Sequence, residues 1–186
     1  MPDITMIDTD RLQLRPFMET DLDALANILA RPDVMEYLYE EPRTRSEVAA
    51  ALEQQMAMNH LTHQGDNLML AIQERASGQM IGSANLIWRS QQHQQGEIGY
   101  TLHPDFQGHG YASEAARAIL RFGFHDMGLH RICGVCDERN SRSRRLMERI
   151  GMQQEALLRQ VEWVKGQWVS HTIYAILRSE WESNQA

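Results

Sequence analysis

The chain has 186 residues, of which 42% are apolar, and a formal net charge of -7 at pH 7. This length is typical of one domain that needs neither metals nor disulfides, so we expect a single domain over residues 1–186. The acidic balance argues against broad nucleic-acid binding, which requires a basic surface. No apolar run reaches the roughly 18 residues of a membrane span, and the acidic start lacks the layout of a signal peptide. We therefore expect a cytoplasmic protein that binds neither membranes nor nucleic acids.

The first part of the chain is predicted to form one strand followed by two helices. Residues 11–15 alternate apolar and polar side chains, as a half-exposed strand does. Thr20 is expected to cap a helix that Pro32 ends. The second helix is predicted from about Ser46 to His63, with Gly65 closing it.

The middle of the chain is predicted to be a meander of three strands over residues 68–74, 80–88 and 97–103. Ser77-Gly78 supplies the first turn, and the polar run 90–95 separates the second strand from the third. The central part of the sheet is therefore expected to be antiparallel.

After Pro104 the pattern changes to a loop with two glycines and then to a helix that Gly128 ends. A short apolar strand follows, so strand, helix and strand form a βαβ unit with a parallel pair. The remaining elements are this strand at 131–136, a helix at 141–150 and two strands near 153–164 and 168–177. The sequence thus predicts the α/β class, with a mixed sheet flanked by helices.

Two groups with metal-like spacing are interpreted as structural. Cys133 and Cys136 form a C-x-x-C inside the predicted strand, where residues three apart point to opposite faces. No second pair completes a zinc site, so two reduced core thiols are expected. His60-x-x-His63 has helical spacing but lacks a third ligand. We therefore predict no metal site.

Residues 97–112 combine a strand, a glycine-bearing loop and the start of a helix, which together suit an anion. A P-loop would continue Gly110 with a lysine, whereas this chain continues with Tyr111. Gly108-x-Gly110-x-x-Ser113 is one glycine short of the dinucleotide fingerprint. These residues alone also fit a loop that merely turns the chain.

Two motifs resemble those of the GNAT superfamily of acetyltransferases. The loop at residues 107–112 is similar to its coenzyme-A loop. Asn140-x-x-Ser143, followed by Gly151-Met152, resembles its second motif, with methionine in place of the usual phenylalanine. The resemblance implies a GNAT fold, which is a central mixed, largely antiparallel sheet with one parallel, splayed pair and flanking helices. It also implies acetyl-CoA as the acetyl donor, without a metal.

Residues 9–16, 97–100 and 110–115 are further similar to the RimJ/RimL-type branch, which acetylates N-terminal amines of ribosomal proteins. The resemblance implies an amine-bearing protein or peptide as acceptor, and it makes a homodimer plausible. Ser170 is a departure, because this branch often has an aspartate there. Two alternatives stay open: a small amine acceptor such as a polyamine, an amino acid or an aminoglycoside, and a coenzyme-binding sensor without catalysis.

The candidate catalytic residues are Glu97 and Ser143. Glu97 precedes the coenzyme loop and is the candidate base, although a surface carboxylate at a strand end is an equal interpretation; Glu74 is a weaker rival. By resemblance, Ser143 protonates the departing thiolate. Serine is also favoured at helix starts, so Ser143 could cap the following helix instead.

The resemblance also implies a set of coenzyme contacts. Backbone N–H groups around Tyr100, Thr101 and Leu102 are expected at the thioester carbonyl, and Asn140 at the pantetheine or a bridging water. The amides expected at the pyrophosphate belong to Gln107, Gly108, His109, Gly110, Tyr111 and Ala112. The arginine-rich run after Asn140 is usually a solvated helix face, yet Arg142, Arg144 or Arg145 could hold coenzyme phosphates.

Overall fold

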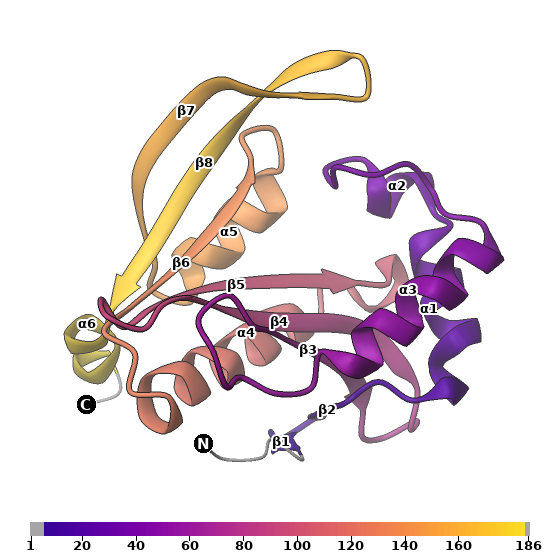
Figure 1. Cartoon of the computed structure of the whole chain (residues 1–186), viewed down its shortest axis with the longest axis horizontal. Helices are drawn as coiled ribbons and strands as arrows, with labels where there is room; N and C mark the ends of the chain where they lie inside the picture. The colour runs from indigo at the N-terminus through magenta and orange to yellow at the C-terminus, as the bar shows by residue number, and fades with distance from the viewer. Residues whose placement is uncertain (1–5, 185–186) are drawn as a thin grey trace.

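The computed structural model describes residues 6–184 and contains an eight-stranded sheet with helices on both faces (Figure 1). The strands are β1 (Ile7–Asp8), β2 (Leu12–Arg15), β3 (Asn67–Glu74), β4 (Met80–Ser90), β5 (Gln95–Leu102), β6 (Arg131–Asp137), β7 (Gln153–Val164) and β8 (Gln167–Leu177). They lie in the order β1-β2-β3-β4-β5-β6-β8-β7. Neighbours are antiparallel except β5 and β6, which run parallel. The mixed α/β sheet predicted from the sequence is therefore confirmed.

The helices cover the two faces of the sheet in separate groups. They are α1 (Leu22–Leu29), α2 (Pro32–Met35), α3 (Arg45–Ala57), α4 (Tyr111–Arg121), α5 (Ser141–Arg149) and α6 (Arg178–Ser183). Apolar side chains of α1 and α3 pack with Ala71 and Met80 on one face, which we call the α3 face. Those of α4 and α5 pack with Leu86 and Ile98 on the other, the α4 face. Within residues 6–184, no helix is long and apolar enough to cross a membrane.

Alternation along β5 places neighbouring side chains on opposite faces of the sheet. Ile98, Tyr100 and Leu102 contact the apolar cluster of the α4 face. Glu97 and Thr101, which alternate with them, therefore point to the α3 face. The two predicted site residues Glu97 and Tyr100 are thus separated by the sheet.

Of two predictions about the first helix, the cap at Thr20 is wrong and the end of the helix at Pro32 is confirmed. Thr20 does not cap it, because Thr20 lies in a 3-10 turn (η1, Glu19–Asp21) and Asp21 takes the N-cap position. The Asp21 carboxylate accepts bonds from Arg15 and from the Met18 N–H, which organise this turn. The helix does end ahead of Pro32: α1 stops at Leu29, and Arg31, before the proline, is extended. Pro32 itself starts α2, where its missing N–H removes no hydrogen bond.

The second predicted helix is also too long, because α3 ends at Ala57 rather than at His63. The chain leaves the helix here to pair with β3, and the Met69 N–H donates to the Met58 carbonyl at 2.7 Å. Leu61 is then buried in the cluster of the other face. His60 and His63 consequently lie outside the helix, and their predicted helical spacing does not exist.

Strands β5 and β6 pair only at their beginnings and then separate. Their register joins Gln95, Gly96 and Glu97 to Arg131, Ile132 and Cys133. Beyond these pairs, β5 continues beside β4 alone and β6 beside β8 alone. Figure 1 shows β5 and β6 diverging from this point, with α5 above the opening. The splayed parallel pair is therefore present, and one backbone edge of residues 98–102 lacks a strand partner.

Candidate active site

The loop between β5 and α4 presents backbone N–H groups to a ligand. Gly108 and Gly110 have φ values of +82° and +85°, which side chains rarely adopt. No atom lies within 4 Å of the position that a Cβ on Gly108 would take, so the backbone there is open to a close approach. Gly110 is the N-cap of α4 and offers no capping side chain to the first N–H groups of the helix. The predicted loop is therefore suited to an anion.

Arg11, at the entrance of β2, holds this loop from one side. Its Nη1 donates to the His109 carbonyl at 2.9 Å, and its guanidinium lies 4.6 Å from the centre of the Tyr111 ring. Its Nε donates to Glu114 in the first turn of α4 at 2.7 Å, and the Thr9 hydroxyl donates to the same carboxylate at 2.6 Å. Arg11 was not predicted as a site residue, although Thr9-x-Arg11 lies in the segment that is similar to the RimJ/RimL-type branch.

The other side of the loop faces α5. Gln107 donates through Nε2 to the Leu102 carbonyl at 3.1 Å and accepts from Arg142 Nη1 at 2.7 Å. Arg144 points elsewhere, because its Nε donates to the Tyr174 hydroxyl at 3.4 Å. Arg145 is exposed on α5. Of these three arginines, Arg142 is the one whose contact with the loop is seen.

Asn140, and not Ser143, caps α5. Its Oδ1 accepts the Ser143 N–H at 3.0 Å, so the predicted alternative of Ser143 as the cap is wrong. The Ser143 hydroxyl instead lies 2.8 Å from the Tyr100 hydroxyl of β5. These two side chains therefore join the separated arms of the sheet on the α4 face.

Glu97 lies at the last register pair before the arms separate, on the α3 face. Its carboxylate accepts from Arg89 Nε at 2.9 Å, its side chain is 21% exposed, and the half-buried Cys133 thiol is 3.9 Å away. Burial raises the pKa of Cys133 to about 11, and the neighbouring Glu97 charge adds to this, so the thiol stays protonated near neutrality. Glu97 is thus held at the opening of the splay.

The rival carboxylate Glu74 is far from this opening. Asn67 and Glu97 both pair with Ile87, whereas Glu74 is seven residues further along β3, which corresponds to roughly 23 Å. Hydrogen bonds from Ser77 and Tyr111 lower the pKa of Glu74. Glu74 therefore supports the start of α4 and not the region around Glu97.

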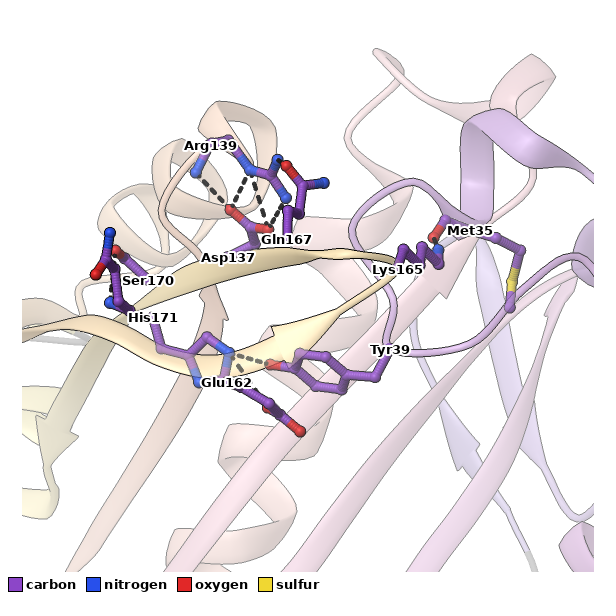
Figure 2. A network of polar contacts seen from close by, with 10 residues as sticks. Met35, Tyr39, Asp137, Arg139, Glu162, Lys165, Gln167, Ser170 and His171 are labelled. Carbon is purple, nitrogen blue, oxygen red and sulfur yellow. Dashed lines mark hydrogen bonds and ion pairs between the residues drawn. The ribbon is translucent and has the colours of Figure 1, made fainter.

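A group of polar side chains on the α3 face was not predicted. The Tyr39 hydroxyl, from the segment after α2, lies 3.1 Å from His171 Nε2 of β8, and Glu162 Oε2 lies 3.5 Å from the same nitrogen (Figure 2). Burial raises the pKa of Tyr39 to about 12, and the charges of Glu162 and Asp137 act in the same direction. Tyr39 is therefore a neutral hydroxyl beside two carboxylates.

Asp137 ends β6 next to this group and is paired with His171 in register. Burial acts to raise its pKa, but hydrogen bonds from Arg139 lower it overall, so the carboxylate stays charged. The Arg139 Nη2 donates to it at 2.5 Å (Figure 2). A charged, 4% exposed carboxylate thus faces the same region as Glu97 and Glu162.

The tip of the β7–β8 hairpin closes one side of this region. Lys165 Nζ donates to the Met35 carbonyl in α2, and Gln167 accepts from Arg139 Nη1 at 3.0 Å (Figure 2). Lys165 and Met35 are 130 residues apart in the sequence, so no local sequence pattern predicts this contact. The contact brings the Tyr39 segment against β8.

Taken as a whole, the described residues fit an elongated ligand with a phosphate-bearing end. The glycine loop and the N-terminus of α4 offer amides to phosphates, and the edge of β5 left by the splay offers N–H and C=O groups to an amide-containing arm. That arm would lead to the opening between Glu97 on one face and Ser143 on the other. The opening is therefore bordered by candidate residues on both faces of the sheet.

Comparisons with known proteins agree with this geometry. The model of the acetyltransferase (GNAT) domain matches residues 11–153. The uncharacterized N-acetyltransferase YnaD of Bacillus subtilis is 34% identical over 94% of this chain and 98% of its own. A crystal structure of a GNAT-family acetyltransferase from Bacillus anthracis superposes with a TM-score of 0.84 at 29% identity, covering 94% of this chain and 99% of that one.

Two relatives have names that specify an acceptor. The putative ribosomal N-acetyltransferase YdaF of B. subtilis is 30% identical over 58% of this chain and 59% of its own. The spermidine N(1)-acetyltransferase of Escherichia coli is 23% identical over 84% and 81%. All of these relatives are N-acetyltransferases. Together with the matching domain model, the splayed sheet and the glycine loop, they show that this chain belongs to the GNAT family of acetyl-CoA-dependent N-acetyltransferases.

Proposed function

We propose that the acceptor is the α-amine of a protein or peptide N-terminus, which reaches the acetyl group from the α3 face. The observation that carries this proposal is the placement of Glu97, Asp137 and Glu162 on that face, around the opening between β5 and β6. Carboxylates attract an ammonium group before it is deprotonated. The similarity to the RimJ/RimL-type branch and to a putative ribosomal N-acetyltransferase supports a peptide acceptor.

A small polyamine is the second candidate, and the same carboxylates support it. Several negative groups around Tyr39 suit a ligand with more than one ammonium group. A relative named as a spermidine N-acetyltransferase supports this alternative. The two candidates differ in what lies beyond the reacting amine, so they are separable by experiment.

Acetyl-CoA supplies an activated acetyl group as a thioester, and the chain has groups for each part of that donor. The amides of Gly108 to Ala112 and the N-terminus of α4 would hold its phosphates, with Arg142 beside them. N–H groups on the free edge of β5, around Tyr100 to Leu102, would hold the carbonyl oxygen as negative charge develops there.

Glu97 is proposed as the base that removes the amine proton, directly or through a water molecule. An α-amine has a pKa of about 8, so much of it is protonated at pH 7 and must lose a proton before attack. Glu97 lies where the strands separate, and Arg89 orients its carboxylate. Asp137 and Glu162 would hold the incoming ammonium group rather than deprotonate it.

Ser143 is proposed to hold a proton at the leaving sulfur on the α4 face. Its position in the first turn of α5 is set by the Asn140 cap, which leaves the hydroxyl free for another partner. A thiol with a pKa near 8.5 is a fair leaving group, so this contribution is expected to be moderate.

The acceptor class is tested by measuring the thiol released from acetyl-CoA with three amines at matched concentration. These are a basic peptide with a free N-terminus, the same peptide with a blocked N-terminus, and spermidine. Turnover of the free peptide alone supports the proposal. Efficient turnover of spermidine, with none of the free peptide, would overturn it and establish the polyamine alternative.

A further inference from the structure

The Tyr100 side chain connects the two arms of the sheet at the point where the leaving sulfur is proposed to lie. Its hydroxyl is 2.8 Å from Ser143 Oγ and 3.2 Å from the Ser143 carbonyl oxygen. Tyr100 belongs to β5 beyond its pairing with β6, whereas Ser143 belongs to α5, which follows β6. The contact is therefore made across the splay and not within one element.

The Ser143 hydroxyl has a second neighbour besides Tyr100. Burial raises the pKa of the Cys136 thiol, and a hydrogen bond from Ser143 acts in the opposite direction. Cys136 points to the α4 face, as Tyr100 and Ser143 do. The serine hydrogen thus has two possible directions, toward the tyrosine oxygen or away from it, on the side where the Cys136 sulfur lies.

The Tyr100 hydroxyl has two acceptors within reach on Ser143, the carbonyl oxygen and Oγ. Burial raises the pKa of Tyr100 far above neutrality, and the Ser143 hydrogen bond only partly offsets this effect. Tyr100 therefore keeps its proton wherever the enzyme works and remains a donor. When the phenol donates to Ser143 Oγ, the serine hydrogen cannot point back at the phenol and is directed to the remaining side.

We propose that Tyr100 is a positioning residue whose hydroxyl donates to Ser143 Oγ and thereby directs the serine hydrogen at the departing sulfur of coenzyme A. The inference rests on the proposed role of Ser143. In the reaction, the amine nitrogen bonds to the acetyl carbon, the carbon–sulfur bond breaks with its electron pair on sulfur, and the amine proton goes to the base. Ser143 keeps its own proton and donates a hydrogen bond to the thiolate, because a hydroxyl is a weaker acid than a thiol.

A simpler role for Tyr100 would be that of a brace between β5 and α5. A brace would affect the binding of every coenzyme A derivative, with or without a sulfur-borne charge. A residue that orients Ser143 would affect only ligands with a thiolate. Binding of coenzyme A and of desulfo-coenzyme A, which lacks the thiol, therefore separates the two roles without using activity.

The experiment is calorimetric titration of both ligands between about pH 7 and about pH 9.5, a range that spans the thiol pKa near 8.5. If Ser143 favours the thiolate, the affinity for coenzyme A relative to desulfo-coenzyme A rises with pH. A hydrogen bond from Ser143 to the charged thiolate is expected to raise this ratio of affinities about tenfold across the pH range. In Tyr100→Phe this rise should be largely lost, while the affinity for desulfo-coenzyme A stays near that of the wild type.

Tyr174→Phe is the matched control, because it also removes a phenol hydroxyl that contacts α5, through Arg144 and Glu148. It should keep the pH-dependent rise. Ser143→Ala should lose the rise, and adding Tyr100→Phe to it should change nothing further.

Three results would overturn the inference, and they differ in what else they affect. If Ser143→Ala loses the rise and Tyr100→Phe keeps it, only the role of Tyr100 is wrong. If Ser143→Ala keeps the rise, the role of Ser143 in the proposed function fails as well. If Tyr100→Phe weakens both ligands equally at every pH, Tyr100 is a brace.

Discussion

Arg11 and Glu114, which are 103 residues apart, form an ion pair of 2.6 Å between the entrance of β2 and the first turn of α4. The same guanidinium donates to the His109 carbonyl of the coenzyme loop. A residue from the start of the chain thereby holds the loop that is proposed to bind the phosphates of acetyl-CoA.

Arg11→Ala should weaken coenzyme A binding about tenfold, equivalent to roughly 1.4 kcal/mol, because the loop loses its support at His109. Its effect on the free energy of unfolding should be about 1 kcal/mol or less, because Arg11 is 47% exposed. Arg178→Ala is the control, since Arg178 is 42% exposed and forms a similar pair with Glu182 in α6, outside the loop and its contacts. Equal affinity for coenzyme A in both variants would exclude this role of Arg11.

Gly110→Val should also weaken coenzyme A binding. A Cβ at this position would lie 3.3 Å from Arg11 Nη2, and the φ of +85° is strained for any side chain. Gly65→Val has the same kind of strain at φ +99°, with no atom near its Cβ and no part in the loop. Both variants should lose about 1–2 kcal/mol of stability, but only Gly110→Val should lose affinity in calorimetry.

Glu97→Gln should lower kcat/KM about a hundredfold near pH 6.5 and less near pH 9, where an α-amine of pKa about 8 is mostly neutral without help. The matched control is Glu74→Gln, which removes the rival carboxylate on β3. Its pH–rate profile should have the wild-type shape. A wild-type profile in Glu97→Gln would instead show that Glu97 is a structural partner of Arg89 and Cys133.

Glu162→Gln should raise KM for a basic peptide by up to about fivefold and leave kcat almost unchanged, which is the size expected for a half-exposed charge. Glu182→Gln in α6 makes the same change of net charge beside Arg178. If the effect is local to the acceptor region, steady-state kinetics should separate the two variants. Equal KM values would mean that only the overall charge of the protein attracts the peptide.

The sheet and most elements were predictable because their signals are local. Alternation over 11–15 and the turn at Ser77-Gly78 lie within a few residues of the strands that they describe. The prediction that α3 extends to His63 failed because Leu61 is buried in the cluster of the opposite face, a long-range effect. Pro32 indicates the end of α1 correctly, but α2, which begins at Pro32, was not predicted, although proline is also suited to the first position of a helix.

The conformation of the glycine loop before α4 was predictable from its glycines and its motif, but the polar group around Tyr39 and His171 was not. The Tyr39 hydroxyl contacts His171, which is 132 residues away in the sequence, and neither residue lies in a sequence motif that predicts a function. The choice between Asn140 and Ser143 as the cap of α5 depended on which side chain turns back to the helix N–H groups. Packing between segments that are distant in the sequence determines which of these side chains meet, and a local sequence pattern does not record it.

Mass spectrometry that identifies the acetylated nitrogen tests directly whether the acceptor is an N-terminal α-amine. The acceptor would be a basic peptide that has a free N-terminus and an internal lysine, incubated with the enzyme and acetyl-CoA. We expect one acetyl group on the α-amine, because that amine is neutral far more often than a lysine of pKa about 10.4. Acetylation of the lysine alone, or of added spermidine but not of the peptide, would contradict this expectation.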